Sequence, residues 1–187
     1  MISQQHLHKI RLAVADIFGW NLKEDLLGDL ERGLLETARE LGIIETTSEI
    51  EKWLKNISWT KKELDILSTH LTVGETYFFR EEAWLDVFKD QIIPEIIRNR
   101  TGKDQSIRIW SAGCCSGEEP YSLAILLNEI IPDLQSWNIT ILGTDINRIF
   151  LAKAERGNYT SWSFRETSQL RRNRFFSQTG DSWQIDS

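Results

Sequence analysis

The sequence predicts an α/β protein in which a small all-α bundle precedes a domain with a parallel sheet. Before residue 70, apolar residues recur at helical spacing and no strand pattern interrupts them. Further along, the β-prone runs 106–113 and 138–145 alternate with two helical patterns. Because strand, helix, strand, helix at this spacing requires crossover connections, we expect parallel strands. The domain boundary is placed so that residues 1–73 form the helical domain and residues 74–187 the sheet domain.

Two amphipathic helices are expected at the start of the chain, over residues 7–18 and 23–41, with Gly42 stopping the second. Two further helix starts carry a hydroxyl followed three residues later by a carboxylate, a pattern typical of a capping box. These pairs are Ser48 with Glu51 and Thr60 with Glu63.

The second domain is expected to begin in LTVGETYFFR, where the helical pattern breaks. A helix then runs from about Glu81, and Pro94 must kink or end it. Helices are also expected over 119–131 and 148–156, each directly after a strand, with Gly157 in the stop position of the last one.

Composition narrows the class of protein. The chain has 187 residues, 41% apolar and 27% charged, with a net charge of -6, so a folded globular protein is expected. Both halves are mildly acidic, which argues against nucleic acid or an anionic membrane surface as the main partner. Without a run of roughly 20 apolar residues or a secretory start, no membrane insertion and a cytoplasmic location are expected.

The turn after the first predicted strand, GCCSGEEP, leads directly into a helix. Its glycines, Gly113 and Gly117, lie four apart and do not form a dinucleotide fingerprint. Glu118 and Glu119 stand at the helix N-terminus, where a phosphate would need the positive dipole to itself. A ligand with positive charge is favoured, and S-adenosylmethionine, with its sulfonium and ammonium groups, fits. A tight turn with solvated glutamates is the alternative reading.

Asp145 ends the second predicted strand and can accept the two hydroxyls of an adenosine ribose. The alternative is a helix N-cap, since the next helix follows at once. The loop and Asp145 fall on consecutive strand ends of one sheet, and this combination favours ligand binding.

Three strings resemble the signature segments of the CheR family, in order and in separation: TYFFRE (76–81), SAGCCSGEEPYSLA (111–124), and GTDI followed by LAKAERGNY. The resemblance implies a Rossmann-like, S-adenosylmethionine-dependent methyltransferase that acts on glutamates of a chemoreceptor-like protein. It also implies cofactor contacts by Thr76, Arg80, Glu119 and Asp145, and places Arg80 near the reacting centre as the catalytic residue. Gly113, at the start of the signature loop, is predicted to bind the cofactor, and Glu118 is a weaker candidate than Glu119.

The sequence departs from this family in several places. Gly74 stands where the family often has Asn, and helix 23–41 carries a net charge of about -3, unlike the basic receptor-binding helix that the resemblance implies. Only about 40 residues follow Asp145, whereas each further strand with its crossover takes about 30, so the methyltransferase domain is expected to be incomplete and to leave an apolar sheet edge uncovered.

Alternatives to the methyltransferase remain. One is a catalytically incomplete cofactor-binding or regulatory module that docks on a signalling partner through the helical domain. No metal is expected, because the three histidines and the adjacent Cys114 and Cys115 form no ligand spacing. The arginines of the last segment are expected to form an exposed basic helix face or to meet an acidic partner. They are Arg165, Arg171, Arg172 and Arg174.

Overall fold

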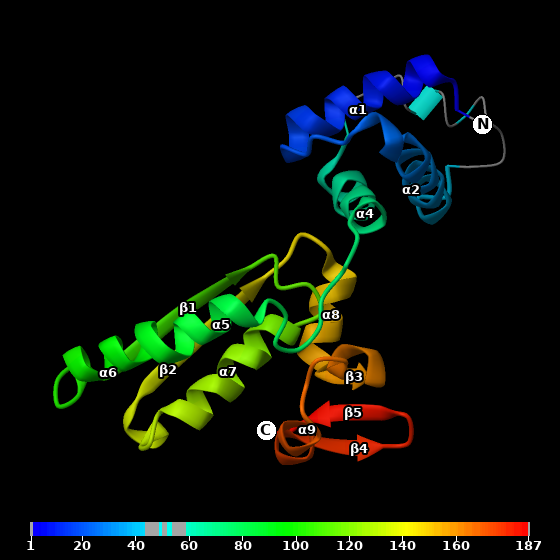
Figure 1. Ribbon diagram of the computed structural model, residues 1–187. Coiled ribbons are helices and arrows are strands. Elements are labelled where there is room, and N and C mark those ends of the chain that lie inside the picture. Colours follow the sequence, from blue (N-terminus) through cyan, green and yellow to red (C-terminus); the bar gives the residue numbers. More distant parts are fainter. Residues whose placement is uncertain (1, 44–48, 50–51, 54–58, 187) are drawn as a thin grey trace. The chain divides into compact units, whose positions relative to one another are not determined.

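The computed structural model describes residues 2–43, 49, 52–53 and 59–186. The chain divides into two compact units, Met1–Val73 and Gly74–Ser187. The first unit is helical in its described part, and the second combines helices with a parallel sheet (Figure 1), which confirms the predicted fold class.

The first unit is built from amphipathic helices around an apolar core. Its elements are α1 (Gln4–Phe18), the 3-10 helix η1 (Glu24–Leu26), α2 (Leu27–Glu40) and α4 (Lys61–Leu71). Leu30, Leu34 and Ala38 recur every four residues on α2 and are buried where that helix packs against α1 and α4. The helices predicted over 7–18 and 23–41 are therefore confirmed, the second with a 3-10 turn at its start.

A capping box starts α4, as predicted. The Glu63 N–H donates to the Thr60 hydroxyl at 3.3 Å, and the Thr60 N–H donates to the Glu63 carboxylate at 2.7 Å. The Thr60 hydroxyl itself donates to the Glu63 carboxylate at 2.6 Å, and this bond, followed by the one from the Thr60 N–H, lowers the pKa of Glu63. The other predicted box, Ser48 with Glu51, lies outside the described residues.

Replacing Thr60 by alanine is expected to lower the free energy of unfolding of the first unit by about 1 kcal/mol, because α4 loses a side-chain acceptor at its N-terminus. Thr60→Ser keeps the hydroxyl and is the matched control. Denaturant unfolding of the whole chain, followed by helical circular dichroism, measures the difference. Equal stability of the two variants would contradict a stabilising cap.

The second unit begins with one long helical stretch, made of α5 (Glu82–Val87), η2 (Phe88–Ile92) and α6 (Ile93–Arg100). η2 is a turn of π-helix directly before α6, whose second residue is Pro94. Proline lacks the N–H that would donate four residues back, and its ring clashes with that carbonyl. A wider π turn accommodates both. The predicted interruption at Pro94 therefore occurs inside a continuing helix.

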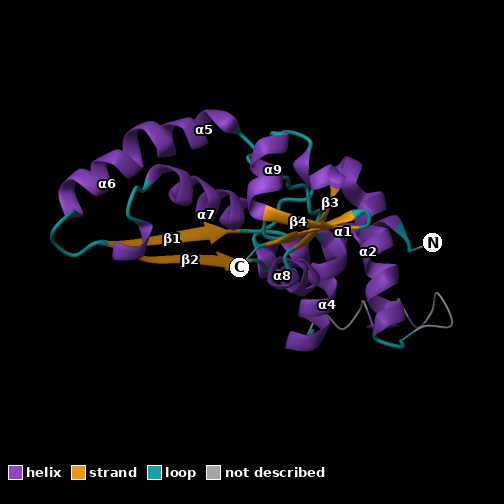
Figure 2. Cartoon of the chain, turned by 90° about the horizontal axis from the view of Figure 1, so that it is seen from below, coloured by secondary structure: helices purple, strands orange, loops and turns teal. Residues whose placement is uncertain are grey.

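A parallel two-stranded sheet follows, as predicted. Its elements are β1 (Ser106–Ala112), α7 (Glu118–Ile130), the 3-10 helix η3 (Leu134–Ser136), β2 (Asn138–Thr144) and α8 (Arg148–Arg156). Ser106 lies opposite Asn138 and Ala112 opposite Thr144, so both strands end at the same edge. Figure 2 shows the two strands side by side with α7 along them. The residues that follow β1 and β2 are thereby brought together.

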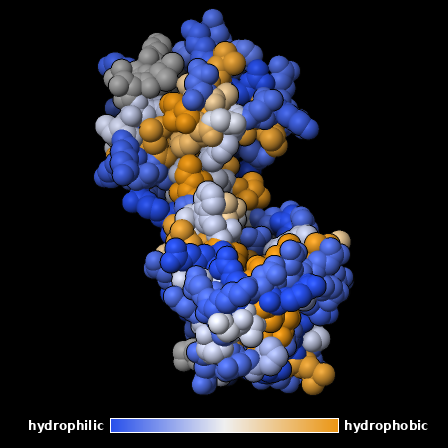
Figure 3. All heavy atoms as spheres, turned by 90° about the vertical axis from the view of Figure 1, so that its left-hand side faces the viewer, coloured by the Kyte–Doolittle hydropathy of each residue, from blue (hydrophilic) through white to orange (hydrophobic). Residues whose placement is uncertain are grey.

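One face of this sheet carries exposed apolar side chains. Trp110 and Leu142, paired in the register, are 68% and 56% exposed. Within the described residues, β1 and β2 pair with no strand other than each other. Figure 3 shows apolar atoms (orange) at the surface among hydrophilic ones (blue). None of the described helices has the length and apolarity needed to cross a bilayer.

After α8 the chain forms a second sheet that the sequence did not predict. Its elements are β3 (Asn158–Thr160), the 3-10 helix η4 (Ser161–Phe164), α9 (Gln169–Phe175), β4 (Phe176–Thr179) and β5 (Ser182–Ile185). The strands pair antiparallel in the order β3-β5-β4. They are three or four residues long, too short to show the alternation on which strand prediction depends.

This second sheet and η4 together supply an aromatic cluster around Phe78. Phe78 is fully buried, with ring centroids 4.8 Å from Tyr159, 5.0 Å from Phe164 and 4.9 Å from Phe176. The contacts with Tyr159 and Phe176 are edge-to-face, a favoured aromatic geometry. The small sheet thus anchors the segment that carries Thr76 and Arg80.

Candidate functional site

The loop between β1 and α7 has an unusual backbone. Gly113, Cys115 and Gly117 all have positive φ, of 79°, 48° and 96°. A Cβ at Gly117 would lie 2.8 Å from the Cβ of Ala154 and 2.9 Å from the hydroxyl of Tyr159, so this glycine is required for space as well as for conformation. At Gly113 a Cβ would meet nothing within 4 Å, because the backbone there borders an open cavity.

The two glutamates at the start of α7 have different environments. Glu118 is only 3% exposed, and its carboxylate accepts hydrogen bonds from the hydroxyls of Ser116 at 2.7 Å and Ser163 at 2.9 Å. Glu119 is exposed, and one carboxylate oxygen accepts from the Ser111 hydroxyl at 2.6 Å. Glu118 therefore holds the loop in place, and Glu119 is the glutamate that can meet a ligand.

Asp145 ties the two strand ends together. One carboxylate oxygen accepts from the backbone N–H of Cys115 and the other from that of Asn147, both at 2.8 Å. The N-cap of α8 is Asn147, whose side chain accepts from the N–H groups of Ile149 and Phe150. The alternative reading of Asp145 as the N-cap is therefore wrong, because a better-placed residue two positions later takes that role.

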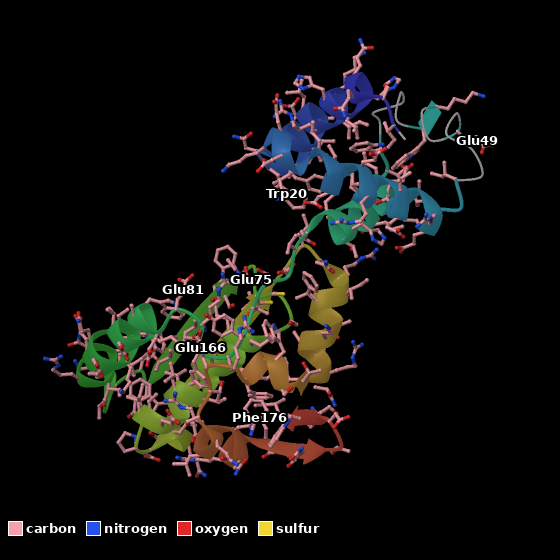
Figure 4. All side chains as sticks on the ribbon, turned by 45° about the vertical axis from the view of Figure 1, so that its right-hand side comes forward. Trp20, Glu49, Glu75, Glu81, Glu166 and Phe176 are labelled. Carbon is pink, nitrogen blue, oxygen red and sulfur yellow. The ribbon has the colours of Figure 1, made fainter. Side chains whose placement is uncertain are left out.

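Residues 76–80, here called the motif arm, connect the start of the second unit to α5. Phe79 and Glu81, the residues on either side of Arg80, have φ values of 60° and 59°, a conformation that bulky side chains rarely adopt. Arg80 points its guanidinium at Glu75, donating to the backbone carbonyl and lying 3.9 Å from the carboxylate. Glu75 and Glu81, at the two ends of the arm, are labelled in Figure 4.

A cavity of about 230 Å³ lies between the motif arm, the loop after β1 and α5. Its lining residues are Glu75, Thr76, Tyr77, Phe79, Arg80, Glu81, Trp84, Leu85, Gly113, Cys114, Cys115, Glu119 and Ser122. Four of the five predicted site residues, Thr76, Arg80, Gly113 and Glu119, thus line one cavity. Asp145 does not line it, but its carboxylate bonds directly to Cys115, which does.

All three non-glycine residues with left-handed backbone, among those the structure describes, line this cavity. They are Phe79, Glu81 and Cys115. Such conformations persist only where the surroundings fix them, and they concentrate at functional sites. Phe79 and Phe78 also belong to the hydrophobic core of the second unit. No local pattern singled out Ser111, Ser122 or Ser163, whose hydroxyls form hydrogen bonds around the site.

At Gly74, where the family often carries a side chain, neighbouring side chains occupy the space that such a side chain would need. A Cβ there would lie 2.3 Å from the ring of Phe150 and 2.9 Å from the sulfur of Cys115. Phe150, on α8, therefore occupies the space beside the loop. The departure at Gly74 is matched by a large ring that fills the position of the missing side chain.

The two cysteines behave as buried thiols. Cys114 and Cys115 are 2% and 9% exposed, and burial raises the pKa of both, with the Asp145 carboxylate adding to the effect on Cys114. A raised pKa keeps a thiol protonated, and metals bind the thiolate. Among the described residues, no group of three or more His, Cys, Asp or Glu is arranged to hold a metal ion.

The arginines that follow η4 are engaged with aromatic rings. The guanidinium carbon of Arg165 lies 3.6 Å from the ring centroid of Tyr77, that of Arg171 4.3 Å from Phe79, and that of Arg172 4.3 Å from Trp183. Arg174 lies over Phe175 at 4.9 Å. Arg165 and Arg174 remain exposed, as expected for a basic surface, whereas Arg171 and Arg172 are half-buried and contribute to the packing of the second unit.

Comparison with known proteins gives one consistent result. Residues 74–187 match the family described as CheR methyltransferase, SAM binding domain. The chain is 39% identical over 125 residues to chemotaxis protein methyltransferase 2 of Vibrio cholerae, covering 66% of this chain and 43% of that protein. It is 36% identical over 122 residues to the chemotaxis protein methyltransferase of Listeria innocua, covering 65% and 44%. With the Borreliella burgdorferi chemotaxis protein methyltransferase it is 33% identical over 163 residues, covering 84% and 56%. The chain spans about half the length of these relatives.

Proposed function

The chain belongs to the CheR methyltransferase family, and from that premise we propose that it serves S-adenosylmethionine-dependent methylation of glutamate side chains on a chemoreceptor-like protein in the cytoplasm. The cofactor of this domain is S-adenosylmethionine. The observation that carries the proposal is the convergence of Thr76, Arg80, Gly113 and Glu119 on one cavity.

The side chains around the cavity suit a positively charged cofactor. Glu119 and Glu75 place carboxylates at the lining. Glu119 stands in the first turn of α7, so the positive end of that helix dipole already faces a carboxylate and is not left free for a phosphate. A volume of about 230 Å³ lies below the roughly 300–1,000 Å³ typical of small-molecule sites. The cavity therefore accommodates part of the cofactor. We assign the ribose to Asp145, at the neighbouring strand end.

The cofactor supplies an electrophilic methyl group on its sulfonium. The acceptor glutamate needs no general base, since a carboxyl with a pKa of about 4.3 is already ionised at neutral pH. The protein's task is to align that carboxylate and to limit its hydration, and orientation of this kind can supply roughly 7–11 kcal/mol. Arg80, on the lining, can hold a carboxylate in a planar two-pronged grip.

The first unit is proposed to dock on the signalling partner, although not through a basic α2 surface. Within α2, Arg32 pairs with Asp29 at 2.6 Å and Arg39 with Glu36 at 2.5 Å, all at exposed positions. Both arginines of α2 are thus paired with carboxylates of the same helix. They support a solvated acidic face rather than a receptor-binding one.

Incubation of the chain with methyl-labelled S-adenosylmethionine and a receptor fragment is expected to give base-labile methyl ester. A fragment whose acceptor glutamates are replaced by glutamine is the matched control and should remain unlabelled. Cofactor binding without ester formation would favour the alternative, a regulatory module that binds the cofactor but transfers no methyl group. Absence of cofactor binding in calorimetry would contradict both.

A further inference from the structure

The motif arm is held against the cavity by its backbone at two points. The Phe78 N–H donates to the Ser163 carbonyl at 2.9 Å, and the Phe79 N–H donates to the Ser122 hydroxyl at 3.0 Å. Both serines lead to Glu118, since the Ser122 hydroxyl donates to its carbonyl and the Ser163 hydroxyl to its carboxylate. These bonds fix the main chain of the arm, but they do not fix the ring of Phe79.

Phe79 borders two cavities. It lines the candidate site, and it also lines a second cavity of about 140 Å³ whose lining includes Arg171, Leu126 and Glu82. Phe79 is a core residue, only 6% exposed, and the cavity space next to it leaves room for a limited displacement of its side chain. Phe79 directly precedes Arg80 and has a left-handed backbone, a conformation that persists only where the surroundings fix it.

Arg171 lies over the ring of Phe79 and lines the second cavity. Its guanidinium carbon lies 4.3 Å from the ring centroid, within the range of a cation–π contact. The same guanidinium donates from Nε at 2.9 Å and from Nη2 at 2.6 Å to the two carboxylate oxygens of Glu129. A two-pronged pair of this kind fixes the plane of the guanidinium as well as its position. Because Glu129 is on α7 and Arg171 on α9, the pair braces the ring from two helices.

We propose that Glu129 and Arg171 are positioning residues that press Phe79 against the candidate site and so hold Arg80 in register with the cofactor. The inference rests on the proposed function, because it takes the role of Arg80 from there. An ion pair at a partly exposed position contributes little to stability by itself. Its effect is expected in the geometry of the arm, where a small displacement is costly to catalysis.

Two variants separate this role from a plain ion pair. Arg171→Lys keeps the charge but loses the planar fork. The swap Glu129→Arg with Arg171→Glu restores an ion pair but leaves no guanidinium at position 171 to lie over Phe79. Arg174→Lys, on the same helix, is the matched control, since Arg174 contacts Asn128 and Phe175 outside the arm.

The thiols of the cavity report on the arm without any cofactor. The chain has two cysteines, Cys114 and Cys115, and both line the candidate site and are buried. Their reaction with a disulfide reagent such as DTNB requires local opening of that site. Thermal unfolding, DTNB rates and the calorimetric affinity for S-adenosylmethionine are measured on the full chain for each variant.

Arg171→Lys and the charge swap are both expected to raise the thiol reaction rate at least about tenfold, equivalent to about 1.4 kcal/mol of lost protection. The swap is expected to unfold near the parent temperature, and Arg174→Lys to match the parent in all three readouts. A swap that restores the parent thiol rate along with stability would overturn the proposal, as would an unchanged rate in Arg171→Lys. If the parent chain does not bind the cofactor, the proposed function is contradicted. The thiol reaction rates need no cofactor, so they still test the bracing role of Glu129 and Arg171.

Discussion

Arg80→Lys is expected to lower methyl-transfer turnover by roughly 10²–10³-fold while leaving the unfolding temperature close to that of the parent, because alignment of the acceptor is lost but little packing is. Arg80 is 40% exposed and lines the candidate site, and its guanidinium is held by Glu75. Lysine keeps the charge but cannot reproduce the two-pronged, planar contact with a carboxylate. The loss should therefore appear mainly in kcat, measured by ester formation at saturating cofactor.

The matched control for Arg80 is Glu75→Gln. The Glu75 carbonyl that accepts from Arg80 is part of the backbone and survives this change, while the carboxylate 3.9 Å away is neutralised. A smaller effect on turnover than that of Arg80→Lys is expected. Near-normal turnover of Arg80→Lys would remove the catalytic role, since the charge alone would then be sufficient.

The first part of the second unit could be predicted from the sequence because each element there has its own local signal. The strand patterns before Gly113 and Asp145, and the glycine that ends α8, correspond to β1, β2 and Gly157 in the structure. Parallel pairing then follows from the order of the elements, without knowledge of any long-range contact. The loop after β1 and Asp145 could be brought to one sheet edge by the same reasoning.

The parts that escaped prediction depend on contacts between distant residues. The strands β3, β4 and β5 are stabilised by an aromatic cluster that includes Phe78, which is far from them in the sequence. The stacking of Arg171 on Phe79 joins residues with no shared local pattern. At Pro94 the proline signal was clear, but whether the helix would end or pass through a π turn depends on packing.

The different roles of adjacent Glu118 and Glu119 illustrate the same limit. Their spacing alone does not say which carboxylate faces a ligand, and only the resemblance favoured Glu119. The structure supplies the physical reason. Ser163, on η4, lies far from the loop in the sequence, yet its hydroxyl donates a hydrogen bond to the buried carboxylate of Glu118. With Glu118 occupied, Glu119 is the carboxylate that remains at the cavity.

Asp145→Ala is expected to weaken the affinity for S-adenosylmethionine by roughly 10–100-fold, since hydrogen bonds to a charged group are worth about 1.5–3 kcal/mol each. Two losses combine in this variant. The proposed acceptor of the ribose hydroxyls disappears, and the backbone N–H groups of Cys115 and Asn147 lose their partner. Isothermal titration calorimetry of the full chain measures the affinity.

Asp145→Asn separates the two contributions. The amide keeps one oxygen and can accept from one of the two N–H groups, so the left-handed Cys115 loses less support than in the alanine variant. If the ribose contact dominates, both variants should bind the cofactor weakly, because the amide presents a single neutral acceptor. If loop support dominates, Asp145→Asn should retain most of the affinity, with slow reaction of the cavity thiols. A folded Asp145→Ala variant with unchanged affinity would show that this carboxylate neither binds the cofactor nor orders the loop that does.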